Sequence, residues 1–411
     1  MLRVLTLASL YPTAERPTFG LFVERETREL AAIDEVDAQI VSPIGVPPWP
    51  LSLHPHYSAR RRLPSRQELN GLIVHRPRFR SYPGPLGKLN GKAMARAVLP
   101  LLRELRHSFP FDVIDAEFFW PDGVAAMHLG AALGVPFSIK ARGSDVHLWG
   151  RTEGVAEQIL EAGRRADGLL AVSGALKSDM AALGMPEQNI RILYTGIDLD
   201  QFHPANRATA KKALGIEGPL LLTAGALIPL KGQALAIDAL EHLPQATLIL
   251  AGEGPERTAL ERRAARFGGR VRFVGGRPHE EVARLMAAAD VLVHPSEREG
   301  LANVWLEALA SGTPIVISDA GGAREIVDRG EAGRVVDRDP RAIAEAVEAL
   351  LADPPAQAEV RKSAERFSWA KNRQEQFDYL SGLVRDYPSR PRPSLDAHLR
   401  SALELPEQRP S

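Results

Sequence analysis

The chain has 411 residues, which is long for one domain and sufficient for two. Its apolar content of 45% and charged content of 25% are those of a soluble globular protein. Lys plus Arg and Asp plus Glu both number 51, so the zero net charge gives no electrostatic support for nucleic-acid binding. The absence of cysteine excludes disulfides, thiol catalysis and zinc–thiolate sites.

The N-terminal run MLRVLTLASLYPT predicts a first strand over Val4–Leu10. The run is too short to span a membrane, and no cleavage site follows a long apolar region, so a cytoplasmic location is expected. Phe19-Gly20-Leu21 then precedes a predicted helix over Phe22–Ile33. Gly20 permits a positive φ and the close approach of a phosphate or sugar, although a tight turn alone also explains it.

Residues 40–90 are rich in Pro and Arg and weakly periodic, which predicts a long irregular insertion. Between Tyr57 and Arg106 there are twelve Lys or Arg residues and two acids, Glu68 and Glu104. A solvated basic face is one explanation. The other is an anionic partner, either a polyanionic acceptor or the inner face of a membrane, to which the protein would bind peripherally.

Strand-like runs alternate with helical patterns along the whole chain, which predicts an α/β fold of two doubly wound units. The predicted strands are Ala38–Ser42, Val113–Ala116, Phe137–Lys140 and Gly168–Val172 in the first half, and Leu220–Ala224, Thr247–Ala251, Val271–Val274, Val291–His294 and Ile315–Ser318 in the second. The segment 193–204 is the predicted junction. Domains are therefore expected at 1–200 and 201–370, followed by a helix over 371–387 and a flexible tail over 388–411.

The segment IKARGSDVH follows a predicted strand, at the sheet edge where open α/β sheets bind ligands. Arg142 cannot act as a base at neutral pH, so its role would be hydrogen bonding or charge neutralisation. Asp145 fits a hydroxyl acceptor or a salt bridge to Arg142, and the salt bridge is the favoured interpretation.

Two glycine-bearing turns and one lysine follow strands of the second half. In LLLTAGALIPLKG, Lys231 lies in a loop between a strand and a helix, where an ammonium group can neutralise a diphosphate leaving group. LILAGEGPERTAL is similar to a dinucleotide-binding fingerprint, but Arg257 occupies the place of the third glycine. A tight turn suffices to explain Gly252.

The stretch EREGLANVWLEALASGTPIVISDAGGAREIV places Glu299 before a predicted helix and Glu307 on it. A helix that begins after Gly300 presents backbone N–H groups and a positive dipole end to a phosphate. Ionised carboxylates are acceptors only, so the two Glu side chains suit hydroxyl groups on either side of that phosphate. This pattern indicates a nucleotide sugar, whereas an isolated Glu pair would be explained as solvated.

The Glu-x7-Glu element with EALASGTPIV and GGAREIV resembles the retaining glycosyltransferases of family four. The resemblance implies the GT-B fold, in which two Rossmann-like domains face a central cleft and a late helix returns to the first domain. It implies that the first domain lies on the acceptor side and that the second binds the nucleotide sugar. It implies catalytic roles for Lys231, Glu299, Arg142 and Asp145. It also implies that main-chain atoms near Arg277 read the base of the donor. The residues implied to contact the donor are Gly20, Gly225, Lys231, Gly252, Arg277, Glu299, Gly300, Leu301, Ala302, Asn303 and Glu307.

The chain departs from the family pattern at two positions. Most members carry Arg five positions before the lysine, where this chain has Ala226, and His where this chain has Arg142. These departures favour a non-catalytic GT-B partner subunit as the alternative, whereas Lys231, Glu299 and Glu307 argue for an enzyme. A nucleotide-sugar epimerase or hydrolase is a third option, but no acid–base groups for it are evident.

The resemblance thus implies a retaining glycosyltransferase, expected to be a hexosyltransferase, that uses a nucleotide diphosphate sugar and neither metal nor cofactor. No catalytic base is evident, and none is needed if the leaving phosphate takes the acceptor proton. The opening LASLYPTAERPTFGLFVERE is similar to members that build polysaccharides, which implies a saccharide acceptor, free or lipid-linked.

Overall fold

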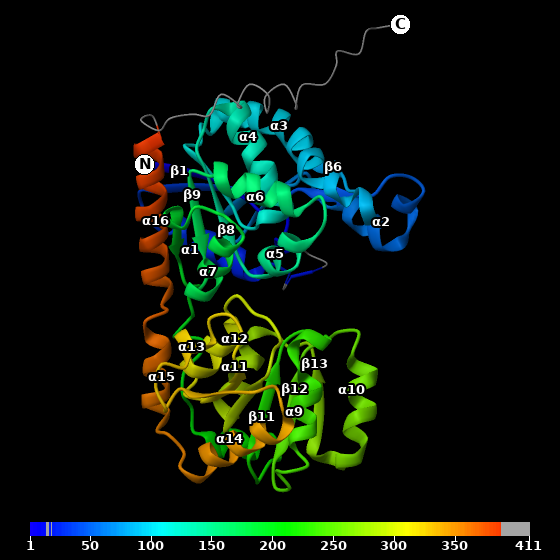
Figure 1. Cartoon of the computed structure of the whole chain (residues 1–411), viewed down its shortest axis with the longest axis vertical. Coiled ribbons are helices and arrows are strands. Elements are labelled where there is room, and N and C mark those ends of the chain that lie inside the picture. The colour runs from blue at the N-terminus through cyan, green and yellow to red at the C-terminus, as the bar shows by residue number, and fades with distance from the viewer. Residues whose placement is uncertain (14–15, 18, 388–411) are drawn as a thin grey trace, which may run out of the picture. The chain divides into compact units, whose positions relative to one another are not determined.

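The computed structural model describes residues 1–13, 16–17 and 19–387. The tail predicted for 388–411 lies outside the described residues. The chain divides into two compact units (Figure 1). Unit 1 comprises Met1–Leu193 together with the described residues from Asn372 onward, and unit 2 comprises Tyr194–Lys371.

Unit 1 is built on an eight-stranded sheet with the order β10-β9-β8-β7-β1-β2-β5-β4. Every neighbouring pair is parallel except β4 and β5, which are antiparallel. The strands are β1 Leu2–Leu7, β2 Val36–Val41, β4 Arg66–Leu69, β5 Leu72–His75, β7 Val113–Ala116, β8 Phe137–Ala141, β9 Gly168–Ala171 and β10 Ile190–Ile192. The parallel crossovers are mostly helical: α1 Leu21–Ala31, α3 Asn90–Ser108, α4 Val124–Leu133, α6 Ala156–Arg165 and α7 Gly174–Ala182.

The prediction that residues 40–90 form a long irregular insertion was wrong. This segment contains the β4–β5 hairpin, which extends the main sheet, and a second, two-stranded parallel sheet of β3 Ile44–Val46 and β6 Arg78–Arg80. The helix α2 Pro55–Arg62 follows β3. These strands are only three or four residues long, so their period-two pattern is too brief to recognise among the Pro and Arg residues.

Unit 2 contains a six-stranded, fully parallel sheet with the order β13-β12-β11-β14-β15-β16. Strands buried on both faces read as continuous apolar runs, and β11 with its sequence LLLTA is buried at every position. The five strands predicted for this half are confirmed: β11 Leu220–Ala224, β12 Thr247–Ala251, β13 Val271–Gly275, β14 Val291–His294 and β15 Ile315–Ser318. A sixth strand, β16 Gly333–Val336, was not predicted.

The last helix, α16 Trp369–Asp386, packs on the sheet of unit 1 (Figure 1). Tyr379, Leu380 and Leu383 share one hydrophobic cluster with Leu2 and Val113. A Cβ atom at Gly168 would lie 2.2 Å from the hydroxyl of Tyr379, so this close packing requires glycine. No helix of the described residues is long and apolar enough to cross a membrane.

Candidate donor site and buried charge network

The carboxyl ends of β11 and β12 come into direct backbone contact at two glycines. Gly225 has a φ of +140°, and its N–H donates to the carbonyl of Ala251 at 2.9 Å. Gly252 has a φ of +151°, and a Cβ atom there would lie 1.9 Å from the carbonyl oxygen of Gly225. Both positions therefore require glycine, and the sheet edge between them presents backbone rather than side chains to a ligand.

Lys231 ends the short 3₁₀ turn Pro229–Lys231 after β11 and is followed by Gly232, which has a φ of +69°. A Cβ atom at Gly232 would lie 2.2 Å from the carbonyl oxygen of Pro295, which fixes this turn against the loop after β14. The Nζ atom of Lys231 consequently lies 2.6 Å from Oε1 of Glu299. The sequence suggested a role for each residue but not their ion pair.

The loop from Glu299 to Ala302 leads into α12 Asn303–Ala310, the helix that was predicted between the two carboxylates. The carbonyl of Gly300 accepts a hydrogen bond from Gly322 N–H at 3.0 Å, and Leu301 and Ala302 are buried. No side chain caps the first turn of α12. The N–H of Trp305 donates to the carbonyl of Ala302, whereas no side chain of the described residues competes for the preceding N–H groups, so the positive end of the helix can face an anion beside the Lys231–Glu299 pair.

Glu307 lies on the second turn of α12 and is buried. Its Oε1 atom is 3.9 Å from Nδ1 of His279, the first residue of α11 His279–Ala288. Arg277 lies just before α11, where its Nε atom donates to the carbonyl of Val274 and its Nη1 atom pairs with Glu281. The side chain of Arg277 is thus directed back onto its own segment.

His294, at the end of β14, was not identified from the sequence. Its Nδ1 atom accepts a hydrogen bond of 3.0 Å from the indole N–H of Trp305, so the proton of the neutral ring resides on Nε2. Burial, together with the charge of Lys231, lowers the pKa of His294 to about 3. The bond anchors α12 to β14, and the only sequence signal was a polar residue at the end of an apolar strand.

In unit 1, Gly20 has a φ of +72° at the start of α1, and a Cβ atom there would lie 2.4 Å from the carbonyl oxygen of Leu10. The turn itself therefore requires glycine. Gly20 and Arg142 line the same surface hollow together with Phe22 and Phe118. The structure thus brings together two of the residues selected from the first half of the sequence.

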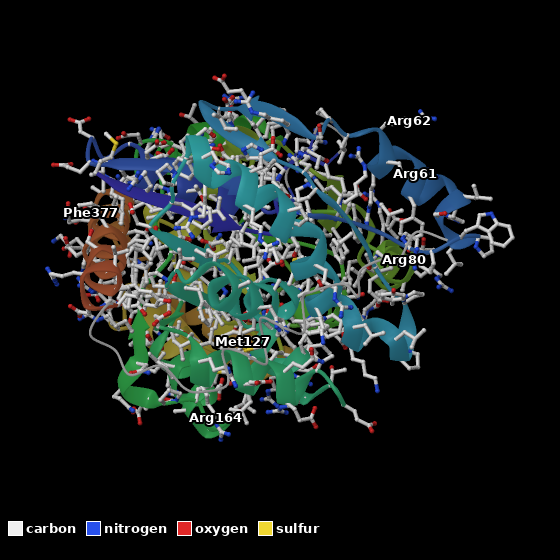
Figure 2. All side chains as sticks on the ribbon, turned by 90° about the horizontal axis from the view of Figure 1, so that it is seen from above. Arg61, Arg62, Arg80, Met127, Arg164 and Phe377 are labelled. Atoms are coloured by element: carbon white, nitrogen blue, oxygen red, sulfur yellow. The ribbon has the colours of Figure 1, made fainter. Side chains whose placement is uncertain are left out.

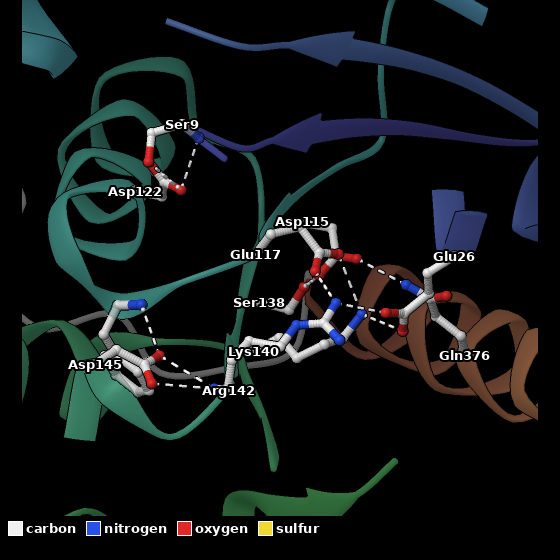
Figure 3. A network of polar contacts seen from close by, with 11 residues as sticks. Ser9, Glu26, Asp115, Glu117, Asp122, Ser138, Lys140, Arg142, Asp145 and Gln376 are labelled. Atoms are coloured by element: carbon white, nitrogen blue, oxygen red, sulfur yellow. Dashed lines mark hydrogen bonds and ion pairs between the residues drawn. The ribbon is translucent and has the colours of Figure 1, made fainter. Parts of the chain in front are cut away.

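The predicted salt bridge between Arg142 and Asp145 was wrong. The guanidinium of Arg142 instead pairs with Glu26 and Glu117, and the ammonium of Lys140 bonds to the same two carboxylates at 2.6 and 3.1 Å (Figure 3). Burial alone would raise the pKa of Glu26, but Arg142 and Lys140 outweigh it and lower that pKa to about 2. Two cations and two carboxylates thus neutralise one another inside unit 1, because α1, β8 and the residues directly after β7 and β8 contribute to one buried cluster.

Asp145 shapes the loop after β8 (Figure 3). Its carboxylate accepts hydrogen bonds from the backbone N–H groups of Arg142, Gly143 and Phe119 at 2.8 to 3.3 Å. These short-range bonds explain why the carboxylate does not turn toward the guanidinium. Asp145 is buried and positions the backbone that carries Arg142.

A second buried carboxylate, Asp122, was also not identified from the sequence. Its Oδ2 atom accepts hydrogen bonds from the N–H and the hydroxyl of Ser9 at 2.9 and 3.1 Å (Figure 3). Its Oδ1 atom is buried without a partner among the described residues. Burial raises the pKa of Asp122 to about 7, although the Ser9 bonds oppose that rise.

No group of three or more His, Asp or Glu side chains in the described residues could hold a metal ion. The positive charge at the site in unit 2 comes from Lys231 and the first turn of α12.

Two family models together span most of the chain. The model for glycosyl transferases group 1 matches residues 206–367, and the model for Glycosyltransferase Family 4 matches residues 28–201. The chain belongs to the glycosyltransferases of family four. This membership confirms the predicted enzyme class, a glycosyltransferase.

The curated relatives of the chain are also named as glycosyltransferases. The chain is 28% identical over 356 residues, 84% of its length and 88% of the relative's, to a putative teichuronic acid biosynthesis glycosyltransferase, TuaC, of Bacillus subtilis strain 168. It is 37% identical over 209 residues to a GDP-mannose-dependent phosphatidylinositol monomannoside mannosyltransferase of Mycolicibacterium smegmatis. That match covers 47% of this chain and 55% of the relative.

Solved structures share the fold at low identity. Sucrose-phosphate synthase from Thermosynechococcus elongatus matches with a TM-score of 0.76 and 21% identity over 94% of this chain and all of that one. Anabaena HepE in complex with UDP-glucose matches with a TM-score of 0.69 and 21% identity over 93% of this chain and all of HepE. These matches confirm the GT-B class, with two Rossmann-like units.

Proposed function

We propose that the chain transfers a sugar, with retention of anomeric configuration, from a nucleotide diphosphate sugar to a saccharide acceptor in glycan assembly. The observation that carries this proposal is the cluster at the carboxyl edge of the unit 2 sheet. There a cation, an uncapped helix start and two carboxylates surround a backbone surface kept clear by Gly225 and Gly252. The relatives' names, which include GDP-mannose-dependent transferases, support a nucleotide sugar donor.

Each group of this cluster has a role that follows from its charge. Glu307 accepts hydrogen bonds from the ribose, and Glu299 accepts them from hydroxyls of the donor sugar. Lys231 and the first-turn N–H groups of α12 stabilise the diphosphate as negative charge grows on it during bond cleavage. The leaving phosphate can accept the acceptor's proton, so this route needs no separate base and no metal.

The Lys231–Glu299 ion pair adds a constraint to these roles. A carboxylate 2.6 Å from the ammonium neutralises part of the charge that would otherwise attract a diphosphate. A bound donor sugar would give the carboxylate hydroxyl partners and release the lysine toward the phosphates. Donor binding and the positioning of Lys231 are thereby coupled through Glu299.

The acceptor side is proposed to lie at an anionic membrane. Exposed apolar side chains follow β3, with Trp49 at 78%, Leu51 at 49% and Leu53 at 64% exposure, and Leu86 and Leu89 are exposed after β6. Because β3 and β6 are parallel, the chain leaves both strands at the same end of the small sheet. Arg61, Arg62 and Arg80 are exposed on the same side of the view in Figure 2.

Exposed Trp and Leu beside cations are the composition of a membrane-interface surface, in which rings enter the headgroup region and cations face anionic lipid. The acceptor would then be lipid-linked, and the protein would bind the inner face of the membrane peripherally.

Incubation of the full chain with a panel of nucleotide sugars, with and without lipid-linked saccharides, tests the proposed function. We expect one nucleotide sugar to release its nucleoside diphosphate and to form an acceptor-dependent product. The anomeric configuration of that product is read by NMR. An inverted product would contradict retention, and no product from any donor would contradict the transfer itself.

A further inference from the structure

A cavity of about 530 Å³ lies within unit 1, at the carboxyl ends of the central strands. Its walls include Ser9 and Tyr11 after β1, Ser42 after β2, and Trp120 after β7. In the sheet, β1 lies between β7 and β2. The strands that follow β1 in the chain are added on the β2 side, and the strands from β7 onward are added on the opposite side of β1. Such a reversal of strand order is where open α/β sheets form their ligand crevice.

Aromatic rings form one wall of this cavity. The rings of Trp120 and Trp149 lie 6.4 Å apart, centroid to centroid, with an interplanar angle of 39°. Both rings line the cavity, and Trp120 is buried whereas Trp149 is partly exposed. Phe19 and Phe79 also contribute to the lining. Flat apolar rings beside a few fixed polar groups suit the C–H face of a sugar ring better than they suit a strongly solvated ion alone.

Two cations line the same cavity, and none of its described lining residues is acidic. The guanidinium carbon of Arg16 lies 3.6 Å from the centroid of the Phe19 ring, which supports one face of the planar group. Partial burial and the neighbouring Arg60 both lower the pKa of Arg16, a sign that the two like charges are close. An anion between them would relieve this repulsion, and an Arg fork matches either a carboxylate or a phosphate.

Tyr11 contributes a buried side chain to the cavity wall. Tyr11 lines the cavity with only 1% of its surface exposed, and its hydroxyl has no hydrogen-bond partner within the described part of the chain. Burial and the charge of Glu24 raise the pKa of this phenol, so the group stays protonated.

We propose that this cavity binds the acceptor, and that the acceptor is a saccharide whose ring packs on Trp120 and Trp149 while its carboxylate or phosphate group is held by Arg16 and Arg60. This inference rests on the proposed transferase function and specifies its acceptor by chemical class. It differs from the donor site, which is built from residues of unit 2 alone.

The test is saturation-transfer NMR and calorimetry on the full chain with three probes: glucose, glucuronic acid and glucose 1-phosphate. We expect one or both anionic sugars to bind at least tenfold more tightly than glucose, and the preferred one identifies the anionic group. Arg16→Gln should reduce that affinity roughly tenfold to a hundredfold, the effect of losing a hydrogen bond to a charged group. Arg16→Lys should retain part of it.

Arg341→Gln is the matched control, because it removes one exposed arginine from unit 2. Thermal unfolding establishes that each variant is folded. Equal affinity for glucose and the anionic sugars, no detectable binding of any probe, or equal losses in Arg16→Gln and Arg341→Gln would overturn the inference. Separate titration with UDP-glucose and GDP-mannose distinguishes the two claims: a chain that binds a donor but none of the probes retains the proposed function and loses this acceptor site.

Discussion

Nζ of Lys231 and Oε1 of Glu299 lie 2.6 Å apart, although the two residues are 68 positions apart in the sequence. The pair joins the turn after β11 to the loop before α12, the two segments proposed to hold the donor diphosphate and the donor sugar. The ammonium and the carboxylate thus belong to one proposed site, and the consequences of removing either partner differ.

Lys231→Ala should lower kcat on the order of a hundredfold or more, with a smaller effect on KM. The reason is that charge on the diphosphate grows as the glycosidic bond breaks, so the cation acts mainly on the transition state. Steady-state kinetics with the preferred nucleotide sugar measure the split. Lys231→Ala also leaves Glu299 without its cation beside the diphosphate. The double variant Lys231→Ala/Glu299→Gln should therefore bind the bare nucleoside diphosphate more tightly than Lys231→Ala. A normal kcat with only a raised KM would show that Lys231 serves binding alone.

Transfer should persist without divalent metal, because Lys231 and the start of α12 place positive charge at the proposed diphosphate site. The measurement is activity after exhaustive EDTA treatment and gel filtration, compared with the untreated enzyme. A complete loss that magnesium or manganese restores would show that the phosphate site has been assigned to the wrong groups.

Asp122 should make stability depend on pH. Burial raises its pKa from 3.8 to about 7. The contribution of Asp122 to the free energy of unfolding is therefore fully present below pH 4 and is lost as the pH rises through 7. Asp122→Asn keeps an acceptor for Ser9 but cannot ionise, so its stability relative to wild type should rise between those two pH values and then level off. The upper limit of this gain is roughly 4 kcal/mol.

Urea unfolding of both proteins at several pH values measures this difference, with the exposed Glu345→Gln as the matched control. If the free energies of unfolding of Asp122→Asn and wild type differ by the same amount at pH 4 and pH 8, Asp122 does not cause the pH dependence of stability.

The exposed cluster after β3 should bind anionic vesicles in a salt-sensitive manner, since surface cations each contribute about 1 kcal/mol near such a surface. Replacing Arg61 and Arg62 by Gln should weaken co-sedimentation at low salt. Replacing Trp49, Leu51 and Leu53 by Ser should weaken it at both low and high salt, because the apolar contact is not screened. Arg341→Gln with Arg385→Gln, both highly exposed, controls for the charge change, and Ile192→Ser controls for the apolar change. Equal pelleting with neutral and anionic vesicles would refute the proposed surface.

The sequence predicted the parts of the fold that depend on local pattern. Buried parallel strands such as Leu220–Ala224 and Thr247–Ala251 are unbroken apolar runs, so their bounds could be read directly. The helix between Glu299 and Glu307 followed from its glycine-bearing turn and apolar stretch. Short strands such as β6, in which only Phe79 of three residues is buried, give too little pattern to detect.

The partners of charged side chains could not be predicted, because they depend on which distant segments the topology brings together. Arg142 was paired with the nearby Asp145, yet its partners Glu26 and Glu117 come from α1 and the segment after β7. The same reason explains why the Lys231–Glu299 pair, the Trp305–His294 bond and the buried Asp122 carboxylate were not foreseen.

The most direct test of the donor assignment is calorimetric titration of Glu307→Ala and Glu299→Ala with UDP and GDP and with UDP-glucose and GDP-mannose. Glu307→Ala should weaken the binding of both the bare nucleoside diphosphate and its sugar conjugate roughly tenfold to a hundredfold, because it would remove the hydrogen bonds proposed to reach the ribose. Glu299→Ala should weaken only the sugar conjugate and leave the bare diphosphate as tightly bound or more so, since Lys231 loses its competing carboxylate. Unchanged affinity in Glu307→Ala, or an equal loss for both ligands in Glu299→Ala, would contradict the account.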